Sequence, residues 1–315
     1  MALDKIDKKI LYELVKDARI TNSAVAKKVR LSKDSVGYRI KQLEKKGFVQ
    51  SYRAIIDVNK IGYQIFRIYF RLIDTNQEEL DEIIQFLKAN KQAWWIAKLE
   101  GNWDFLFAYH AKSNKDFYDF YFKFNQKFRK HIKEKMIAPI PFYREIPKRY
   151  LTGEQELITI APSDEKIEID EKDKHLLKIL SKNGKITILK LSEETNLDIK
   201  TIKSRIKKLE EQKIILGYTT EINSSKLDRD FYTIGIDLND FKKYKAIKEE
   251  LISHPEVTSW VLSIGGYDIE CDIEIENTKR FYEITNQLKN NHSEIREIRY
   301  FRITENYKIQ YMPEE

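Results

Sequence analysis

Apolar side chains recur at helical spacing over the first fifty residues and predict three short helices. Thr21 can cap the second helix and Ser32 the third, because their hydroxyl oxygens can accept from free backbone amides. Gly47 is a C-terminal stop for the third helix. The buried stripe of that helix is predicted at Val36, Ile40 and Leu43. The following stretch, FVQSYRAIID, alternates in polarity and predicts a short hairpin arm, so the segment indicates a winged helix-turn-helix.

A different pattern follows, in which short apolar strands alternate with amphipathic helices. Predicted strands cover residues 65–73, 94–101, 104–111 and 136–146, and predicted helices cover 77–90 and 114–131. This order of one strand, helix, two strands, helix and strand is the ferredoxin-like βαββαβ arrangement.

Both patterns occur twice along the chain. In the first pattern a residue matches the residue 166 positions later, as in Asp7 with Asp173, Arg39 with Arg205 and Tyr52 with Tyr218. In the second pattern a spacing of 164 aligns Gly101 with Gly265 and Asp104 with Asp268. The second copy predicts elements at 230–238, 241–253, 257–265, 268–275, 278–290 and 295–309. A register held over such a length indicates duplication of the two modules in the same order.

The predicted fold class is therefore α+β, with two winged helix-turn-helix domains alternating with two ferredoxin-like βαββαβ domains. The predicted boundaries are 1–60 and 166–226 for the winged helices, 61–150 and 227–315 for the ferredoxin-like domains, and 151–165 for a linker. The linker is acidic and contains Gly153 and Pro162, which favours an exposed connection.

Composition narrows the class of protein. No apolar run approaches the length of about 18 residues that spans a bilayer, so no membrane partner is expected. Cys271 is the only cysteine, which excludes an internal disulfide and a thiolate cluster for zinc, and a cytoplasmic location is predicted. The five histidines are scattered without metal-ligand spacing, and neither a metal nor another cofactor is predicted.

Charge is distributed unevenly. The net charge is +8 over residues 1–60 and +4 over 166–226, the two blocks that hold the predicted winged helices. It is +5 over 61–150 and −6 over 227–315. Clustered basic charge is typical of a protein that binds a phosphate backbone, although a lysine-rich surface alone would give a similar excess.

The sequence resembles the Lrp/AsnC family of prokaryotic transcription regulators, twice over. The residues that carry the resemblance are LDKIDKKILYELVKDARI, LSKDSVGYRIKQLEKKGFV and LEGNWDFLF in the first half. In the second half they are DEKDKHLLKILSKNGKIT, LDIKTIKSRIKKLEEQKIILGY and SIGGYDIECDI. The resemblance implies an N-terminal winged helix that binds DNA, and a C-terminal βαββαβ domain (the RAM type) that pairs with another copy. It also implies small-molecule effectors, often amino acids, near a G-x-x-D turn. The usual family chain holds one such unit, so the tandem chain departs from that pattern.

The third helix of each copy is the predicted recognition helix. A helix in the major groove must offer hydrogen-bond donors to base edges and cations to phosphates. The candidate DNA-binding residues are Lys33, Ser35, Tyr38, Arg39, Lys41 and Gln42 in the first copy, and Lys200, Thr201, Lys203, Ser204, Arg205, Lys207 and Lys208 in the second. Each arginine could instead pair with a nearby carboxylate, and the two roles can coexist.

The two recognition helices differ on their outward faces while their buried stripes stay apolar. Aligned pairs are Lys33 with Ile199, Asp34 with Lys200, Gly37 with Lys203, Tyr38 with Ser204 and Gln42 with Lys208. A symmetric dimer imposes a palindromic site, whereas a fused pair with different heads can select an asymmetric one. The hypothesis is that the halves share a fold and differ in base preference.

The candidate effector-binding residues are Gly101, Asn102, Asp104, Gly265, Gly266 and Asp268. Glycine permits a positive φ and close backbone approach, and the aspartate can accept from a ligand ammonium group. The alternative is a plain β-turn whose aspartate accepts from a backbone amide. Opposite charges on the two ferredoxin-like domains favour an intramolecular pseudo-dimer, and further dimerisation of chains stays open.

Two other classes of protein stay open at this stage. Siroheme decarboxylases share the two-module architecture and also occur as fused pairs, but the histidine of their signature is missing from the corresponding stretches QAWWIAKLEGNWDFLF and VTSWVLSIGGYDIECD. The prediction is therefore that the chain is not an enzyme. A non-DNA-binding adaptor is the other alternative, because Glu193 and Glu194 stand where the first copy has Lys27 and Lys28, and acids facing phosphate would repel it.

Overall fold

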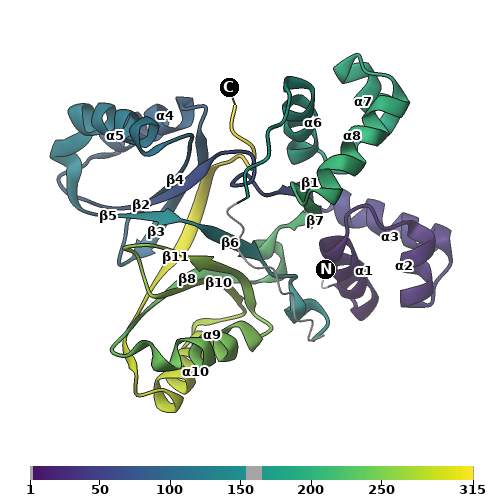
Figure 1. Ribbon diagram of the computed structural model, residues 1–315. Coiled ribbons are helices and arrows are strands. Elements are labelled where there is room, and N and C mark those ends of the chain that lie inside the picture. The colour runs from purple at the N-terminus through teal and green to yellow at the C-terminus, as the bar shows by residue number, and fades with distance from the viewer. Residues whose placement is uncertain (1–2, 154–164, 315) are drawn as a thin grey trace. The chain divides into compact units, whose positions relative to one another are not determined.

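The computed structural model describes residues 3–153 and 165–314 (Figure 1). Most of the predicted linker at 151–165 lies outside the described residues. The described chain divides into two compact units. The first unit holds residues up to 61, with 147–153 and 165–228, and the second holds 62–146 and 229–314.

The first unit contains the predicted three helices in each copy. They are α1 Lys5–Lys16, α2 Asn22–Val29 and α3 Lys33–Lys45, then α6 Glu171–Lys182, α7 Ile188–Thr195 and α8 Ile199–Glu211. Each begins after a residue whose side chain accepts from a backbone amide of the first turn, namely Asp4, Thr21, Ser32, Asp170, Thr187 and Asp198. The caps predicted at Thr21 and Ser32 are thus confirmed, and the stripe of Val36, Ile40 and Leu43 is buried.

One strand follows each set of three helices, β1 at Val49–Ile56 and β7 at Ile215–Ile222. The two strands pair with each other in antiparallel fashion, and Arg53 lies opposite Thr219. These two residues are counterparts in the repeat, so the pairing is symmetric about them. The prediction of a hairpin arm within each copy was wrong, because the strand pairs with the other copy.

Reciprocal backbone bonds tie each strand to the helices of the opposite copy. The amide of Ala18 donates to the carbonyl of Tyr218 over 2.9 Å, and the amide of Gly184 donates to the carbonyl of Tyr52 over 2.7 Å. The hydroxyl of Thr219 also donates to the carbonyl of Val15, at the end of α1. Each strand therefore finds its neighbours in the other copy, which explains why neither forms a hairpin of its own.

The second unit contains two copies of the βαββαβ order, as predicted. The first copy holds β2 Gln64–Leu72, α4 Gln77–Ala89, β3 Ala93–Gly101, β4 Phe105–Ala111, α5 Asn114–Phe128, β5 Ile132–Ile140 and β6 Phe142–Glu145. The second holds β8 Asp230–Leu238, α9 Tyr244–Ser253, β9 Val257–Leu262, β10 Ile269–Ile275, α10 Thr278–Asn291 and β11 Ile295–Ile309. Short 3-10 turns cover Arg129–His131, Arg149–Leu151, Ser224–Leu227 and Phe241–Lys243. The strand predicted at 136–146 begins earlier and is divided at Pro141.

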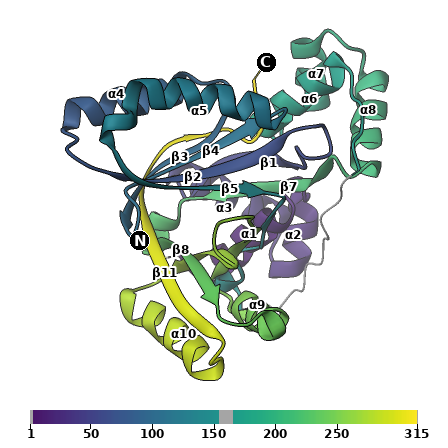
Figure 2. The ribbon, with the colours of Figure 1, turned by 60° about the vertical axis from the view of Figure 1, so that its left-hand side comes forward.

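The strands of both copies form one sheet in the order β5-β2-β4-β3-β11-β8-β10-β9-β6. The long strand β11 pairs with β8 of its own copy and with β3 of the other (Figure 2). Likewise β5 pairs with β2, and its continuation β6 pairs with β9 of the other copy. Because only Pro141 separates β5 from β6, the first and last strands of the order belong to one segment and the sheet closes on itself.

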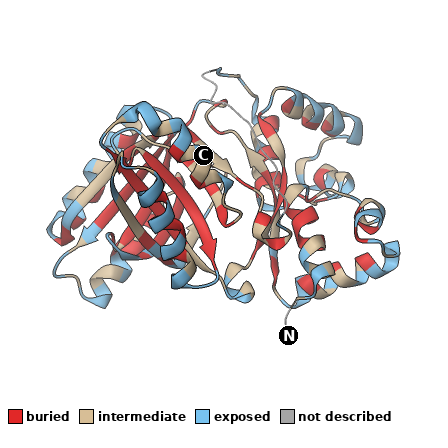
Figure 3. Cartoon of the chain, turned by 90° about the horizontal axis from the view of Figure 1, so that it is seen from below, coloured by how far each residue is buried: buried red, intermediate tan, exposed pale blue. Residues whose placement is uncertain are grey.

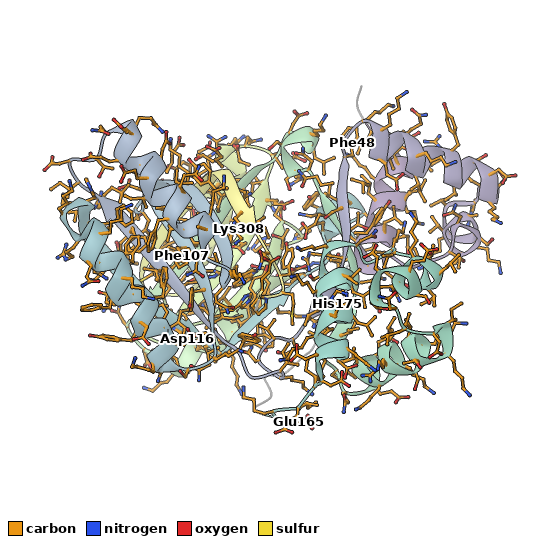
Figure 4. The ribbon with its side chains drawn as sticks, turned by 90° about the horizontal axis from the view of Figure 1, so that it is seen from above. Phe48, Phe107, Asp116, Glu165, His175 and Lys308 are labelled. Atoms are coloured by element: carbon orange, nitrogen blue, oxygen red, sulfur yellow. The ribbon has the colours of Figure 1, made fainter. Side chains whose placement is uncertain are left out.

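Each copy covers one face of its strands with its own two helices. Phe107 of β4 lies in the core under α4 and α5 (Figure 4). Phe281 of α10 lies in the corresponding core of the second copy, together with residues of α9. Strands β4 and β10 are buried along their whole length and hence on both faces, and buried strands are drawn red in Figure 3. Alternate strand residues therefore point to the helices and to the interior between the two copies.

Candidate nucleic-acid interface

The two recognition helices are held by the same local construction. Ser32 caps α3, Asp198 caps α8, and the buried stripe of each helix fixes which side faces outward. In α8 that stripe is Ile202, Ile206 and Leu209. The residues of α3 that point outward are the predicted ones, because a stripe at helical spacing leaves the remaining positions on the opposite face.

The first recognition helix presents a mixed polar and aromatic face. Lys33, Ser35 and Lys41 are exposed, and Tyr38 has 66% of its surface accessible. Gln42 is half-buried. An open groove of about 660 Å³ runs beside this helix and brings together Ser35, Tyr38, Arg39 and Gln42 with Asp4 and Asp7 of the first helix. An exposed tyrosine between hydrogen-bonding side chains can contact both base edges and sugars.

The second recognition helix presents a more uniformly basic face. The exposed members of the predicted set are Lys200, Lys203, Ser204, Lys207 and Lys208. Thr201 is half-buried, and its hydroxyl donates to the cap residue Asp198 over 2.5 Å. Thr201 is therefore engaged in capping, whereas the lysines carry the charge of this face.

The two arginines of the recognition helices bind carboxylates in both copies. The Nη1 group of Arg39 lies 2.7 Å from Asp4 and 2.7 Å from Asp7. In the second copy the Nη1 group of Arg205 lies 2.8 Å from Asp170 and 2.8 Å from Asp173. The structural role that the sequence left open is thus present, and it ties the start of the first helix to the recognition helix. The matched aspartates at the start of each copy were the available signal for it.

Hydrogen bonds around these ion pairs shift the pKa of their members. The hydrogen bond with Asp7 raises the pKa of Arg39, and the bond with Asp173 raises the pKa of Arg205. The backbone amide of Asp7 lowers the pKa of Asp4, and the amide of Asp173 does the same for Asp170. Both carboxylates are therefore charged at neutral pH and hold their arginine in place.

The middle helices differ between the copies. Lys28 of α2 donates to the buried Glu13 over 2.5 Å, so part of the basic charge predicted there is neutralised within the fold. In α7 the counterparts Glu193 and Glu194 are exposed. The first copy is consequently less repulsive to phosphate than the second on this side.

In the G-x-x-D turns of the second unit both aspartates accept from a backbone amide, but that amide belongs to a neighbouring strand and not to the turn itself. Asp104 accepts from the amide of Leu72 over 2.7 Å, and Asp268 accepts from the amide of Leu238 over 2.7 Å. Both carboxylates thereby close off the end of the neighbouring strand. Asn102 is exposed at the first turn.

The glycines of these turns lie close to the other copy. Gly101 has a φ of +124°, and a Cβ there would come within 2.8 Å of the carbonyl of Tyr300. Gly265 has a φ of +73°, and a Cβ on Gly266 would come within 3.2 Å of the Cβ of Ala138 in the first copy. The indole of Trp103 donates to the hydroxyl of Tyr267 over 2.9 Å, so the two turns meet each other. Trp103 and Tyr267 are counterparts in the repeat, so the sequence of one copy alone could not have predicted their contact.

Two kinds of feature are absent from the part of the chain that the structure describes. Among residues 3–153 and 165–314, no group of three or more histidine, cysteine, aspartate or glutamate side chains could hold a metal ion. In the same part of the chain no helix is both long and apolar enough to cross a membrane.

Parts of the chain match known sequences. A family model described as winged helix-turn-helix DNA-binding matches residues 3–50 and 169–215. The chain is 31% identical over 122 residues to the leucine-responsive regulatory protein of Rhizobium meliloti, across 38% of this chain and 76% of that protein. It is 40% identical over 86 residues to the regulator LrpA of Pyrococcus horikoshii, across 27% of this chain and 60% of that protein.

A solved structure matches the full length. The siroheme decarboxylase NirDL superposes with a TM-score of 0.66 over 98% of this chain and 94% of that chain, at 13% identity. This likeness shows that the two proteins share the tandem fold and nothing more. The sequence relatives and the twice-matched helix-turn-helix model decide the family: the chain belongs to the Lrp/AsnC family of transcriptional regulators and carries the family's unit in tandem duplication.

Proposed function

We propose that the protein is a cytoplasmic, sequence-specific transcription regulator that reads DNA with both α3 and α8. The observation that supports it is the pair of exposed polar faces on two helices of the same unit, joined by the β1–β7 pairing. Because that pairing links the two copies directly, the two heads would contact DNA as one body with a fixed spacing.

The proposed contacts fall into two kinds. Ser35, Tyr38 and Gln42 would supply base and sugar contacts from the first head, while Lys33 and Lys41 would neutralise phosphates. In the second head the exposed lysines and Ser204 would do the same. Arg39 and Arg205 would act chiefly as positioning residues, with their remaining N–H groups free for a phosphate, since a guanidinium has five donors.

An asymmetric operator follows from the different heads. Tyr38 and Gln42 of the first head stand where the second has Ser204 and Lys208, so the two half-sites would be read by different chemistry. In the same proposal the two ferredoxin-like domains form an intramolecular pseudo-dimer. The domain boundaries given above are the proposed division of the chain.

An amino-acid effector is the finer part of the proposal. One relative is named a leucine-responsive regulatory protein, which makes amino acids the class to test first. The candidate residues are those of the two turns, above all Asn102, whose side chain is exposed. A ligand would have to bind beside Asp104 and Asp268 and not in their place, because both carboxylates already accept strand amides.

Selection of bound sequences from a random duplex pool tests the proposal. The expected result is a site with two unlike half-sites whose spacing is constant. Recovery of perfect palindromes alone would contradict the asymmetric reading. Failure to enrich any sequence, together with haem-like absorption of the purified protein, would instead favour the decarboxylase alternative.

A further inference from the structure

An arginine and a glutamate meet in the closed interior of the second unit. Arg67 of β2 and Glu270 of β10 form an ion pair, and the side chains of both are fully buried. The hydroxyl of Tyr69 donates to the same carboxylate oxygen over 2.8 Å. The rings of Trp94 and Trp95 lie within 5.7 Å and 5.5 Å of the guanidinium. Burial raises the pKa of Glu270 and the guanidinium opposes that shift, so the arginine is what favours the charged carboxylate.

The repeat shows what each partner would meet in a different pairing. The counterpart of Arg67 is Thr233, and the counterpart of Glu270 is Leu106, as the equivalent strand registers require. If two first copies paired in the same geometry, Arg67 would face Leu106 and lie buried without a carboxylate. If two second copies paired, Glu270 would face Thr233 and lie buried without a cation.

The first unit repeats the arrangement at the β1–β7 pairing. Arg53 of β1 is almost fully buried and its Nε group bonds Glu221 of β7. The counterpart of Arg53 is Thr219 and the counterpart of Glu221 is Ile55, so neither charged residue has a charged counterpart in the other copy. Because Arg53 lies opposite its own counterpart, pairing of two first copies would set Arg53 directly against a second Arg53.

We infer that two arginine–glutamate pairs code for unlike pairing, so that each half of the chain accepts the other half and rejects a copy of itself. In Arg67–Glu270 both side chains are buried, and in Arg53–Glu221 the arginine is buried and the glutamate half-buried. In both units the arginine comes from the first half and the glutamate from the second. An uncompensated buried charge is strongly unfavourable, whereas an exposed pair discriminates little. Each interface therefore fits the opposite half, and its buried charges disfavour pairing with a copy of the same half.

The inference rests on the proposed intramolecular pairing and can be tested with cysteine pairs in the full chain. Lys98 lies opposite Glu305, and Leu262 lies opposite Phe142. A Lys98→Cys/Glu305→Cys pair therefore reports unlike pairing, because opposed antiparallel residues are within disulfide range. By the repeat, Leu262→Cys/Glu305→Cys can meet only when two second copies from different chains pair. The native Cys271 is buried, and burial raises the pKa of its thiol.

The decisive background exchanges each charged residue for its counterpart: Arg53→Thr, Glu221→Ile, Arg67→Thr and Glu270→Leu. In the native background we expect an intrachain disulfide from the unlike reporter and none from the like reporter. In the exchanged background we expect the like reporter to give disulfide-linked dimers on a non-reducing gel. The control Arg302→Thr/Glu100→Leu removes an exposed pair between β11 and β3 and should leave the native result unchanged.

Three outcomes decide the matter. Equal interchain linkage from the like reporter in both backgrounds overturns the inference, and so does its absence from a folded exchanged variant. The two-residue exchange Arg67→Thr/Glu270→Leu serves if the fourfold variant is unfolded, since apolar replacement of a complete buried pair is usually tolerated. An interchain bond from the unlike reporter would contradict the intramolecular pseudo-dimer and leave the code standing, because it still joins unlike halves.

Discussion

The recognition helices α3 and α8 share an apolar stripe and an arginine tied to two aspartates, yet their outward faces differ. Tyr38 on the first helix is replaced by Ser204 on the second, and Gly37 by Lys203. Positions that hold each copy together were kept, since a change there costs stability in every context. The outward positions, which would meet DNA under the proposed function, changed, so duplication gave one scaffold with two different outward faces.

The two copies also differ in the interior of the second unit, and there the difference is one of charge. The inward residues of β10 are Glu270, Asp272 and Glu274, all buried. Their counterparts on β4 are Leu106, Ala108 and His110. Asp272 is satisfied within its own copy by the hydroxyl of Thr233 at 2.7 Å, whereas Glu270 needs Arg67 of the first. The halves have therefore become complementary as well as different.

Removal of Arg67 should produce the largest effect, because it breaks that complementarity. The variant Arg67→Met leaves Glu270 buried without its cation, and we expect a loss of about 3–5 kcal/mol in the free energy of unfolding. Urea denaturation followed by circular dichroism measures it. The matched change Arg302→Met removes an arginine that pairs across the halves with the exposed Glu100, and should cost less than about 1 kcal/mol. Equal losses would show that burial of the pair is unimportant.

His110 gives the next largest effect, through pH. Burial lowers the pKa of His110 to about 3, so the folded protein keeps this ring neutral. In the unfolded chain the ring has its ordinary pKa of 6.5 and takes up a proton below that pH. Stability conferred by the neutral ring is complete above pH 6.5 and is lost as the pH falls toward 3. The slope is about 1.4 kcal/mol per pH unit for one proton.

The variant His110→Phe removes this linkage. We expect the difference in unfolding free energy between pH 7 and pH 4.5 to be smaller in the variant than in the native protein by about 2–3 kcal/mol. Parallel pH profiles for the native protein and His110→Phe would rule out a neutral buried ring.

Replacement of the turn glycines, one in each half, should lower the free energy of unfolding by different amounts, and by less than removal of Arg67. Gly101→Ala must adopt a φ of +124° and places its Cβ 2.8 Å from a backbone carbonyl, so we expect a loss of about 2–3 kcal/mol. Gly265→Ala has a φ of +73° and meets nothing closer than 4.0 Å, so about 1 kcal/mol is expected. Thermal unfolding of both variants measures the difference, and a reversed order would contradict the close approach at Tyr300.

Much of this fold could be predicted because the repeat supplied every local pattern twice. The strand at 230–238 and the long strand at 295–309 match β8 and β11 at both ends. The hairpin expected from FVQSYRAIID failed, because alternating polarity shows that a strand exists but not which strand it pairs with. The Arg67–Glu270 pair was equally invisible, since 203 residues separate the partners and neither has a charged counterpart in the repeat.

The site residues show the same limit. The outward faces of α3 and α8 followed from helical spacing alone, which fixes direction once the stripe is known. The bonds of Arg39 to Asp4 and Asp7 required the first helix to lie against the third. The bond between Trp103 and Tyr267 required both copies at once.

The smallest predicted effect is on DNA binding by the two recognition helices, α3 (the first head) and α8 (the second head). Lys33→Gln/Lys41→Gln in the first head and Lys203→Gln/Lys207→Gln in the second each remove two exposed cations. We expect the first double variant to weaken binding to a selected site by about tenfold, or ~1.4 kcal/mol, and the second by less. The reason is the exposed Glu193 and Glu194 of α7, which would repel phosphate if they face DNA.

Titration of binding against salt gives the cleaner measurement. Each lysine that contacts a phosphate adds about 0.9 to the slope of log affinity against log salt, so loss of two contacts lowers the slope by nearly two. The control Lys115→Gln alters an exposed lysine of α5, paired with Asp119 in the other unit, and should leave the slope as it is. An unchanged slope for the first double variant would remove α3 as a phosphate-contacting helix. Equal reductions in the two heads would mean that the acids of α7 face away from DNA and that the copies bind as equals.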